Sequence, residues 1–271
     1  MICLKILDKN QNIVATEAGD QEATLIVSRE YEEGDKIVVE ITEKPCHVWI
    51  QMDDAIGKSL VYVKENIVYE IPFGNRKINL SPKAFSGKCH LICVRRAYDF
   101  ETACYRNLAL NVNDQHGNTM FYPHASANVE TRGEVIFAAM NTIDGVTANH
   151  GHGEWPFTSW GINQNPNAKM KVDFGRLVEV DRLILYLRAD FPHDNWWEKC
   201  IVKFSNGEER TLSFQKTDKA QEFMIGKMQI SWLEISHLLA SAEPSPFPAL
   251  TQIEVYGIEV REEDEKNETN S

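Results

Sequence analysis

Short apolar runs follow one another through the first hundred residues, with turn residues between them. They cover residues 24–27, 36–41, 47–52, 59–63, 67–71 and 90–95. These runs are rich in β-branched and aromatic residues, which is typical of strands. Turn sequences such as Glu33-Gly34-Asp35 separate them. Since no long amphipathic pattern interrupts the series, residues 1–104 are predicted to form a β-sandwich.

The pattern changes near residues 99–105, beyond which polar loops lengthen between the strands. Further strands are predicted at residues 169–174, 180–187, 200–204, 210–214 and 251–257. Asn206-Gly207 predicts a hairpin turn. Residues 130–139 favour a short helix, and residues 229–239 favour a strand followed by a short helix. The predicted fold is all-β, with a second sandwich at 105–260 and an acidic, disordered tail at 261–271.

The composition narrows the classes of function. A formal net charge of −12 argues against nucleic-acid binding, which needs clustered Lys and Arg, and against binding to anionic membranes. The first residues do not resemble a signal peptide, and no apolar run reaches the roughly 18 residues of a membrane helix. A cytoplasmic location is therefore expected. The six cysteines form no Cys-x-x-Cys pair, so reduced thiols are expected.

Several short motifs follow one another along residues 105–260. They are Asn107-Leu108-Ala109-Leu110, Asp144-Gly145, Val172-Asp173-Phe174-Gly175, the run 202–207 and Ile253-Glu254-Val255-Tyr256-Gly257. Together they resemble galactose-binding-like modules of the discoidin, or coagulation factor 5/8 C-terminal, type. The resemblance implies a jelly-roll β-sandwich that binds a carbohydrate through loops at one end. It also implies a structural calcium ion beside Asp144, although Gln252 stands where the family usually has a glutamate.

Two loops of this second half, at 149–163 and 188–198, hold four of the six tryptophans. An aromatic face packs on the C–H face of a sugar, while carboxylate, amide, guanidinium and imidazole groups bond its hydroxyls. The residues predicted to contact a ligand are His150, His152, Trp155, Asn163, Arg188, Asp190, His193, Asp194, Trp196 and Trp197. Trp196 or Trp197 is expected to be the aromatic platform, whereas Trp160 is expected in the core.

The same loops leave other hypotheses open beside a non-catalytic carbohydrate-binding protein. His150 and His152 have a spacing that places two imidazoles on one face of a strand, and His193 with Asp194 would complete a metal site. The second hypothesis is thus a metal-dependent enzyme acting on a sugar or a related small molecule. A third is a protein-interaction module, whose N-terminal sandwich contacts a partner or a second copy in an oligomer.

Overall fold

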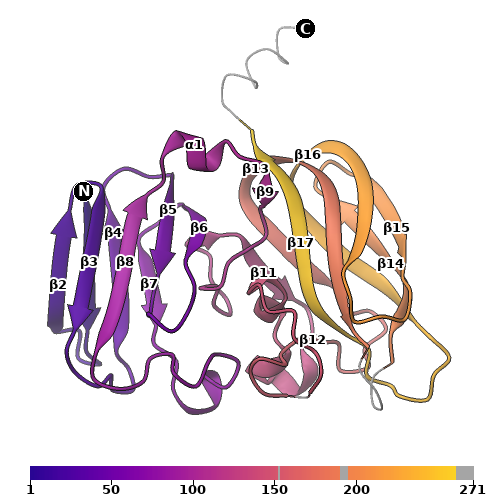
Figure 1. Ribbon diagram of the computed structural model, residues 1–271, viewed down its shortest axis with the longest axis horizontal. Helices are drawn as coiled ribbons and strands as arrows, with labels where there is room; N and C mark the ends of the chain where they lie inside the picture. Colours follow the sequence, from indigo (N-terminus) through magenta and orange to yellow (C-terminus); the bar gives the residue numbers. More distant parts are fainter. Residues whose placement is uncertain (152, 190–194, 261–271) are drawn as a thin grey trace, which may run out of the picture.

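The computed structural model describes residues 1–151, 153–189 and 195–260. Its regular structure is almost entirely antiparallel strand, in two layered halves that lie side by side (Figure 1). The predicted all-β fold class is confirmed. No helix within the three described ranges is long and apolar enough to cross a membrane. The acidic tail predicted at 261–271 lies outside the described residues.

Two sheets pack face to face in the N-terminal half. Their strands are β1 (Ile2–Leu7), β2 (Ile13–Gly19), β3 (Glu22–Val27), β4 (Lys36–Ile41), β5 (Cys46–Gln51), β6 (Ser59–Val63), β7 (Ile67–Glu70), β8 (His90–Arg96) and β10 (Phe121–Tyr122). One sheet has the order β2-β1-β4-β7 and the other β10-β6-β5-β8-β3. Alternate side chains, such as Ile2, Leu4 and Ile6 of β1, point inwards and are fully buried. They belong to one core that both sheets share.

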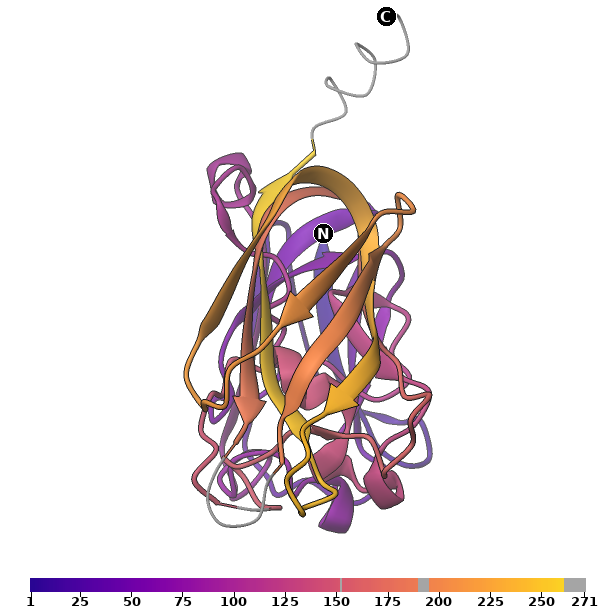
Figure 2. The same cartoon turned by 90° about the vertical axis from the view of Figure 1, so that its right-hand side faces the viewer.

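The C-terminal half is built on a single eight-stranded sheet. Its strands are β9 (Arg106–Asn107), β11 (His124–Ala127), β12 (Trp160–Gly161), β13 (Met170–Arg188), β14 (Trp197–Phe204), β15 (Glu209–Ser213), β16 (Gln221–Ala240) and β17 (Ala249–Glu259). The main path runs β12-β17-β13-β16-β14-β15, with β9 added to β17 and β11 to β13. The long strands β13 and β16 arch over, so that one sheet covers the core from two sides (Figure 2).

The helical segments are short. They are η1 (Gly74–Arg76), α1 (Asp99–Thr102), η2 (Thr131–Gly133), η3 (Val135–Phe137) and η4 (Ala139–Ile143). The helix predicted at 130–139 is wrong, because Arg132 has a φ of 55° and interrupts the helical path. The helix predicted towards Leu239 is also wrong. Residues 229–239 continue β16, which pairs with β13 as far as Ile235 and with β14 from Leu233 onwards.

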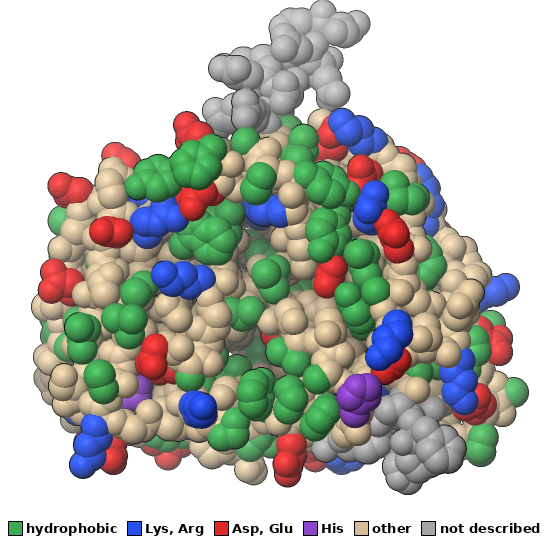
Figure 3. Space-filling model, viewed as in Figure 1, with side chains coloured by type: hydrophobic (Ala, Val, Ile, Leu, Met, Phe, Trp, Pro, Cys, Tyr) green, Lys and Arg blue, Asp and Glu red, His purple; other side chains and the backbone are tan. Residues whose placement is uncertain are grey.

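The two halves are joined by more than the connecting chain. β10 follows β9 in sequence, yet it pairs with β6, and the buried Phe121 packs into the N-terminal core. Figure 3 shows the surface hollowed between the two halves, and acidic and basic side chains interspersed on this face. A cavity of about 340 Å³ is lined by residues of both halves, including Tyr69 and Asn79 from one and His116 and Glu130 from the other.

A buried charge cluster around Glu259 also links the halves. Arg176 donates to both carboxylate oxygens of Glu259, from Nε at 2.7 Å and from Nη2 at 2.5 Å. Arg106 donates a further bond at 2.5 Å, and His47 of β5 lies 3.3 Å from the same carboxylate. Burial alone would raise the pKa of Glu259, but the hydrogen bonds and the charge of Arg176 hold it well below its usual range. The carboxylate is therefore ionised between its cationic partners.

Replacing Glu259 with alanine should lower the free energy of unfolding by about 3–5 kcal/mol, because Arg176 and Arg106 would keep their buried charges without a partner. Urea denaturation measures the change. The matched control is Glu40→Ala, which breaks the partly exposed surface pair with Lys5 and should cost about 1 kcal/mol or less. The contribution of Glu259 should be lost as the pH falls below 4.5, its ordinary pKa. Equal losses in the two variants would contradict the role given to this cluster.

Candidate functional site

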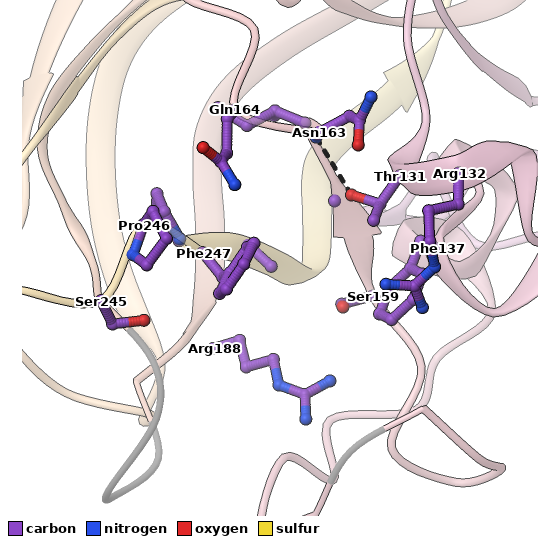
Figure 4. Close-up of a pocket in the computed structure, with 14 residues that line it drawn as sticks. Thr131, Arg132, Phe137, Ser159, Asn163, Gln164, Arg188, Ser245, Pro246 and Phe247 are labelled. Atoms are coloured by element: carbon purple, nitrogen blue, oxygen red, sulfur yellow. Dashed lines mark hydrogen bonds between the residues drawn. The ribbon is translucent and has the colours of Figure 1, made fainter.

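One end of the C-terminal sandwich opens into a cavity of about 590 Å³. It is lined by Thr131, Arg132, Phe137, Ser159, Gly161, Ile162, Asn163, Gln164, Arg188, Ser245, Pro246, Phe247, Pro248 and Ala249. These residues come from η2, η3, β12 and the residues on either side of it, the end of β13, and the segment that leads into β17 together with its first residue. In Figure 4, Phe247 and Pro246 face Ser159 and Phe137 across the cavity. The volume falls in the usual range of small-molecule sites.

The turn after β12 presents two amides to this cavity. Asn163 and Gln164 both adopt positive φ, at 49° and 57°, which is a conformation that Asn tolerates better than most residues. The Asn163 backbone N–H donates to Thr131 Oγ1 at 3.0 Å (dashed in Figure 4). A side chain at Gly161 would collide with the same hydroxyl, since an added Cβ would lie 2.5 Å from it. The turn therefore packs closely against η2 and is fixed in position.

The side-chain amides of Asn163 and Gln164 make no hydrogen bond within the described residues. The opposite wall carries Phe247, whose side chain is 53% exposed between two prolines. The two arginines that line the cavity, by contrast, already bind other groups of the protein. Arg132 forms a two-pronged ion pair with Glu134, with N···O distances of 2.6 and 2.7 Å. The lining thus offers an exposed aromatic ring and neutral amides, with its cations already paired.

Arg188 holds the loop that contains Gly151 and Phe157 against the end of β13. Its side chain is buried, and its Nη1 donates to the Phe157 carbonyl oxygen at 3.1 Å. Its Nη2 donates to the carbonyl oxygen of Gly151. Because it binds the carbonyl oxygens of Gly151 and Phe157 while lining the cavity, Arg188 has a positioning role for this wall.

Other predicted contact residues lie elsewhere. His150 is exposed, and its Nδ1 is 3.8 Å from a carboxylate oxygen of Asp218. Trp155 is 39% exposed, and its backbone N–H donates to the Ile78 carbonyl oxygen of the N-terminal half. Neither lines the cavity. Of the predicted set, Asn163 and Arg188 are brought together there.

The expectation that Trp197 contacts a ligand is corrected by the structure. Trp197 is 1% exposed and packs in the core against Trp160, with ring centroids 6.0 Å apart. The reason is the alternation of β14, which turns Trp197 inwards and Glu198 outwards. Trp196 is half-buried against the same core. The core position predicted for Trp160 is confirmed, and its indole N–H donates to the Val129 carbonyl oxygen at 3.0 Å.

Four other predicted residues, His152, Asp190, His193 and Asp194, lie outside the described residues. The metal-enzyme hypothesis depends on three of them and stays a prediction. Sequence reasoning missed Phe247, Gln164 and Thr131. The sequence Pro246-Phe247-Pro248 could have indicated an exposed phenylalanine, because a strand of the core would not carry two prolines so close together.

Asp144 caps the turn at which calcium is expected. Its Oδ1 accepts the Val146 backbone N–H at 2.7 Å, and burial raises the pKa of its carboxyl to about 8. Gln252 is fully buried in β17, and both polar atoms of its amide lack a hydrogen-bond partner among the described residues. No cluster of three or more His, Cys, Asp or Glu ligand groups in the described ranges includes Asp144.

Several solved structures resemble about half of this chain. A chitosan-binding module of a chitosanase/glucanase from Paenibacillus sp. IK-5 shares 18% identity, covers 56% of this chain and 98% of its own, and has a TM-score of 0.39. The family 32 carbohydrate-binding module of C. perfringens NanJ, in complex with galactose, shares 18% identity. The match covers 49% of this chain and 91% of that module, with a TM-score of 0.37. The lectin domain of lectinolysin, complexed with Lewis B antigen, shares 21% identity. The match covers 55% of this chain and 94% of that domain, with a TM-score of 0.39.

No protein-family model matches this chain, and no curated protein matches it.

Replacing Trp197 with alanine should cost about 3–5 kcal/mol of stability, the usual cost of removing a large buried aromatic side chain. Trp196→Ala is the matched control and should cost clearly less, because this side chain is only partly covered. Thermal or urea unfolding of both variants measures the difference. If Trp197→Ala were as stable as the parent, the core position of Trp197 would be refuted.

Proposed function

We propose that this protein binds a neutral carbohydrate without catalysing a reaction, and that the cavity between Phe247 and the Asn163–Gln164 turn holds the sugar. The observation that carries the proposal is an exposed aromatic ring placed across a cavity from amides that have no partner among the described residues. This combination suits a ligand that is apolar on one face and rich in hydroxyls at its edge.

The aromatic wall supplies the hydrophobic part of binding. A pyranose presents a patch of C–H groups, and stacking that patch on Phe247 removes apolar area from water at about 25 cal/mol per Å². Pro246 and Pro248 flank the ring, and their fixed φ reduces the freedom that this loop would lose on binding. Phe247 is thus the platform that we assign in place of the tryptophan expected from the sequence.

The amides supply specificity. Each side-chain amide offers both a donor and an acceptor, so Asn163 and Gln164 can bond the paired hydroxyls of a sugar ring. Their positive-φ turn is anchored to Thr131, which keeps the amides in place before binding. An anionic sugar is disfavoured, because Arg132 is already paired with Glu134, Arg188 already bonds two carbonyl oxygens, and the chain carries a net charge of −12.

Phe247→Ala should weaken sugar binding by about tenfold or more, because roughly 1.4 kcal/mol of stacking is lost. A glycan array would identify a neutral ligand, and isothermal calorimetry would then compare the variants. Phe100→Ala is the matched control, since Phe100 is 73% exposed on α1 in a different part of the molecule. Unchanged affinity in Phe247→Ala, or no carbohydrate bound at all, would refute the proposal.

We also propose a structural calcium ion at the turn of Asp144. The buried Gln252 amide has no hydrogen-bond partner among the described residues, and the Asp144 carboxyl accepts one N–H; both offer oxygen ligands of the kind that a hard cation such as calcium prefers. The raised pKa of Asp144 means that its carboxyl holds a proton near neutral pH in the calcium-free protein. Calcium would have to displace this proton, so its apparent affinity should increase as the pH rises towards 8.

The unfolding temperature of the parent protein should be higher in calcium chloride than in EDTA. The unfolding temperature of Asp144→Asn should be the same in both. In EDTA, the protonated Asp144 carboxyl contributes fully to the free energy of unfolding below pH 3.8, its ordinary pKa. This contribution is lost as the pH rises towards about 8, the pKa of this carboxyl in the folded protein. Asp144→Asn keeps an acceptor for the Val146 N–H and should therefore lose less stability between pH 5 and pH 8. An unfolding temperature that calcium does not move would exclude the ion.

A further inference from the structure

Three ligand groups converge at one end of the N-terminal sandwich, in the half that does not hold the sugar cavity. Asp53 and Asp54 lie two and three residues after the end of β5, and His90 begins β8. One potential ligand atom of each residue lies within 4.8 Å of the others. Asp53 and His90 are each 1% exposed, whereas Asp54 is exposed. The cluster is thus mostly buried but can be reached from solvent through Asp54.

Hydrogen bonds hold the three groups in orientations that suit metal binding. His90 Nε2 lies 3.2 Å from the Gly87 carbonyl oxygen, and Nδ1 lies 3.2 Å from Asp53 Oδ2. A donor bond from Nε2 to a backbone carbonyl is the usual way in which a protein fixes a metal-binding imidazole. Asp53 Oδ1 accepts the Ala55 N–H at 2.9 Å, and Asp54 Oδ1 accepts the Leu91 N–H at 3.3 Å. Asp54 Oδ2 then remains for a ligand, whereas Asp53 Oδ2 already faces His90 Nδ1.

Tyr31 provides a second, independent observation. Its hydroxyl is buried and lacks a hydrogen-bond partner among the described residues. Its ring stacks on His90, with centroids 4.1 Å apart. Burial is the main cause that raises the pKa of this phenol, and the charge of Asp53 adds to it. A buried hydroxyl without a partner is costly unless a bound group satisfies it.

We propose that Asp53, Asp54 and His90 form a binding site for a divalent transition-metal ion of the zinc type. The imidazole Nδ1 and one oxygen of each carboxylate are the three protein ligands, and the Tyr31 ring stacks on the imidazole. Two ligand atoms at about 2.0–2.1 Å from a tetrahedral metal are about 3.3 Å apart. The observed separation of 3.2 Å between His90 Nδ1 and Asp53 Oδ2 is close to that value.

The ligand set decides the class of metal. A nitrogen ligand favours zinc and its neighbours over calcium or magnesium, which prefer oxygen ligands alone. The metal ion would tie together the segment after β5 and the start of β8, where the Tyr31 ring packs on the imidazole.

The test uses the full chain, purified without a histidine tag and stripped with EDTA in the presence of a phosphine reductant. Zn²⁺ is titrated in competition with a chromophoric chelator, and Co²⁺ is added separately to record visible absorption. The diagnostic variant is Asp54→Asn, because its side chain is exposed and its Oδ1 can still accept the Leu91 N–H. Folding is checked by circular dichroism, and a variant of buried His90 is not needed.

Two controls match this variant. Asp20→Asn removes an exposed carboxylate that precedes β3, whereas Tyr31 follows that strand, so the two lie at opposite ends of it. Cys89→Ser removes the exposed thiol next to His90, which could bind zinc by itself. We expect one equivalent of Zn²⁺ in the parent and both controls, with affinity reduced about tenfold or more in Asp54→Asn. Co²⁺ should give the spectrum of a four-coordinate ion in the parent.

The proposal is overturned if the parent binds no stoichiometric Zn²⁺. It is overturned equally if Asp54→Asn binds as tightly as Asp20→Asn, or if Cys89→Ser alone abolishes binding. The first result would leave His90 and Asp53 as a structural hydrogen-bonded pair. The last would assign the metal to a surface thiol.

Discussion

The hydrogen-bonded register between β13 and β17 sets the geometry on which both ends of the C-terminal half depend. At one end it pairs Arg188 with Ala249, and both residues line the cavity. At the other end it pairs Val178 with Glu259, which reaches the junction between the two halves. Because side chains alternate along a strand, a slip of one residue would turn Glu259 away from Arg176 and would bring different residues to the cavity. One ladder therefore fixes the junction and the proposed sugar site together.

The cavity combines a rigid frame with an open chemical surface. Arg188 and Thr131 hold its backbone through bonds to carbonyl oxygens and to an N–H group, while Phe247, Asn163 and Gln164 face the space that remains. Groups that are fixed before binding lose little freedom when a ligand arrives. The cluster of Asp53, Asp54 and His90 belongs to the other sandwich, with a different core. A metal there would stabilise the N-terminal half without entering the sugar site.

The sequence predicted the strands well, because β-branched and aromatic runs between turn residues have few alternatives. Prediction from the sequence failed at positions where contacts between distant parts of the chain determine the local structure. The helix at 130–139 was lost to the positive φ of Arg132, which no periodicity reveals. Asn163 and Arg188 were predicted as contacts from their residue types. Trp197 was misplaced because loop composition does not tell where β14 begins. Phe247 was missed because it lies far along the chain from the loops that it faces.

The central claim is that a neutral sugar occupies the cavity between Phe247 and the Asn163–Gln164 turn. Nuclear magnetic resonance of the isotope-labelled chain, titrated with neutral mono- and disaccharides, tests it most directly, because backbone amide shifts locate the ligand without a mutation. The account predicts saturable shifts confined to residues 131–137, 159–164, 188 and 245–249. Saturable shifts elsewhere, or no shift with any neutral sugar at millimolar concentration, would contradict it.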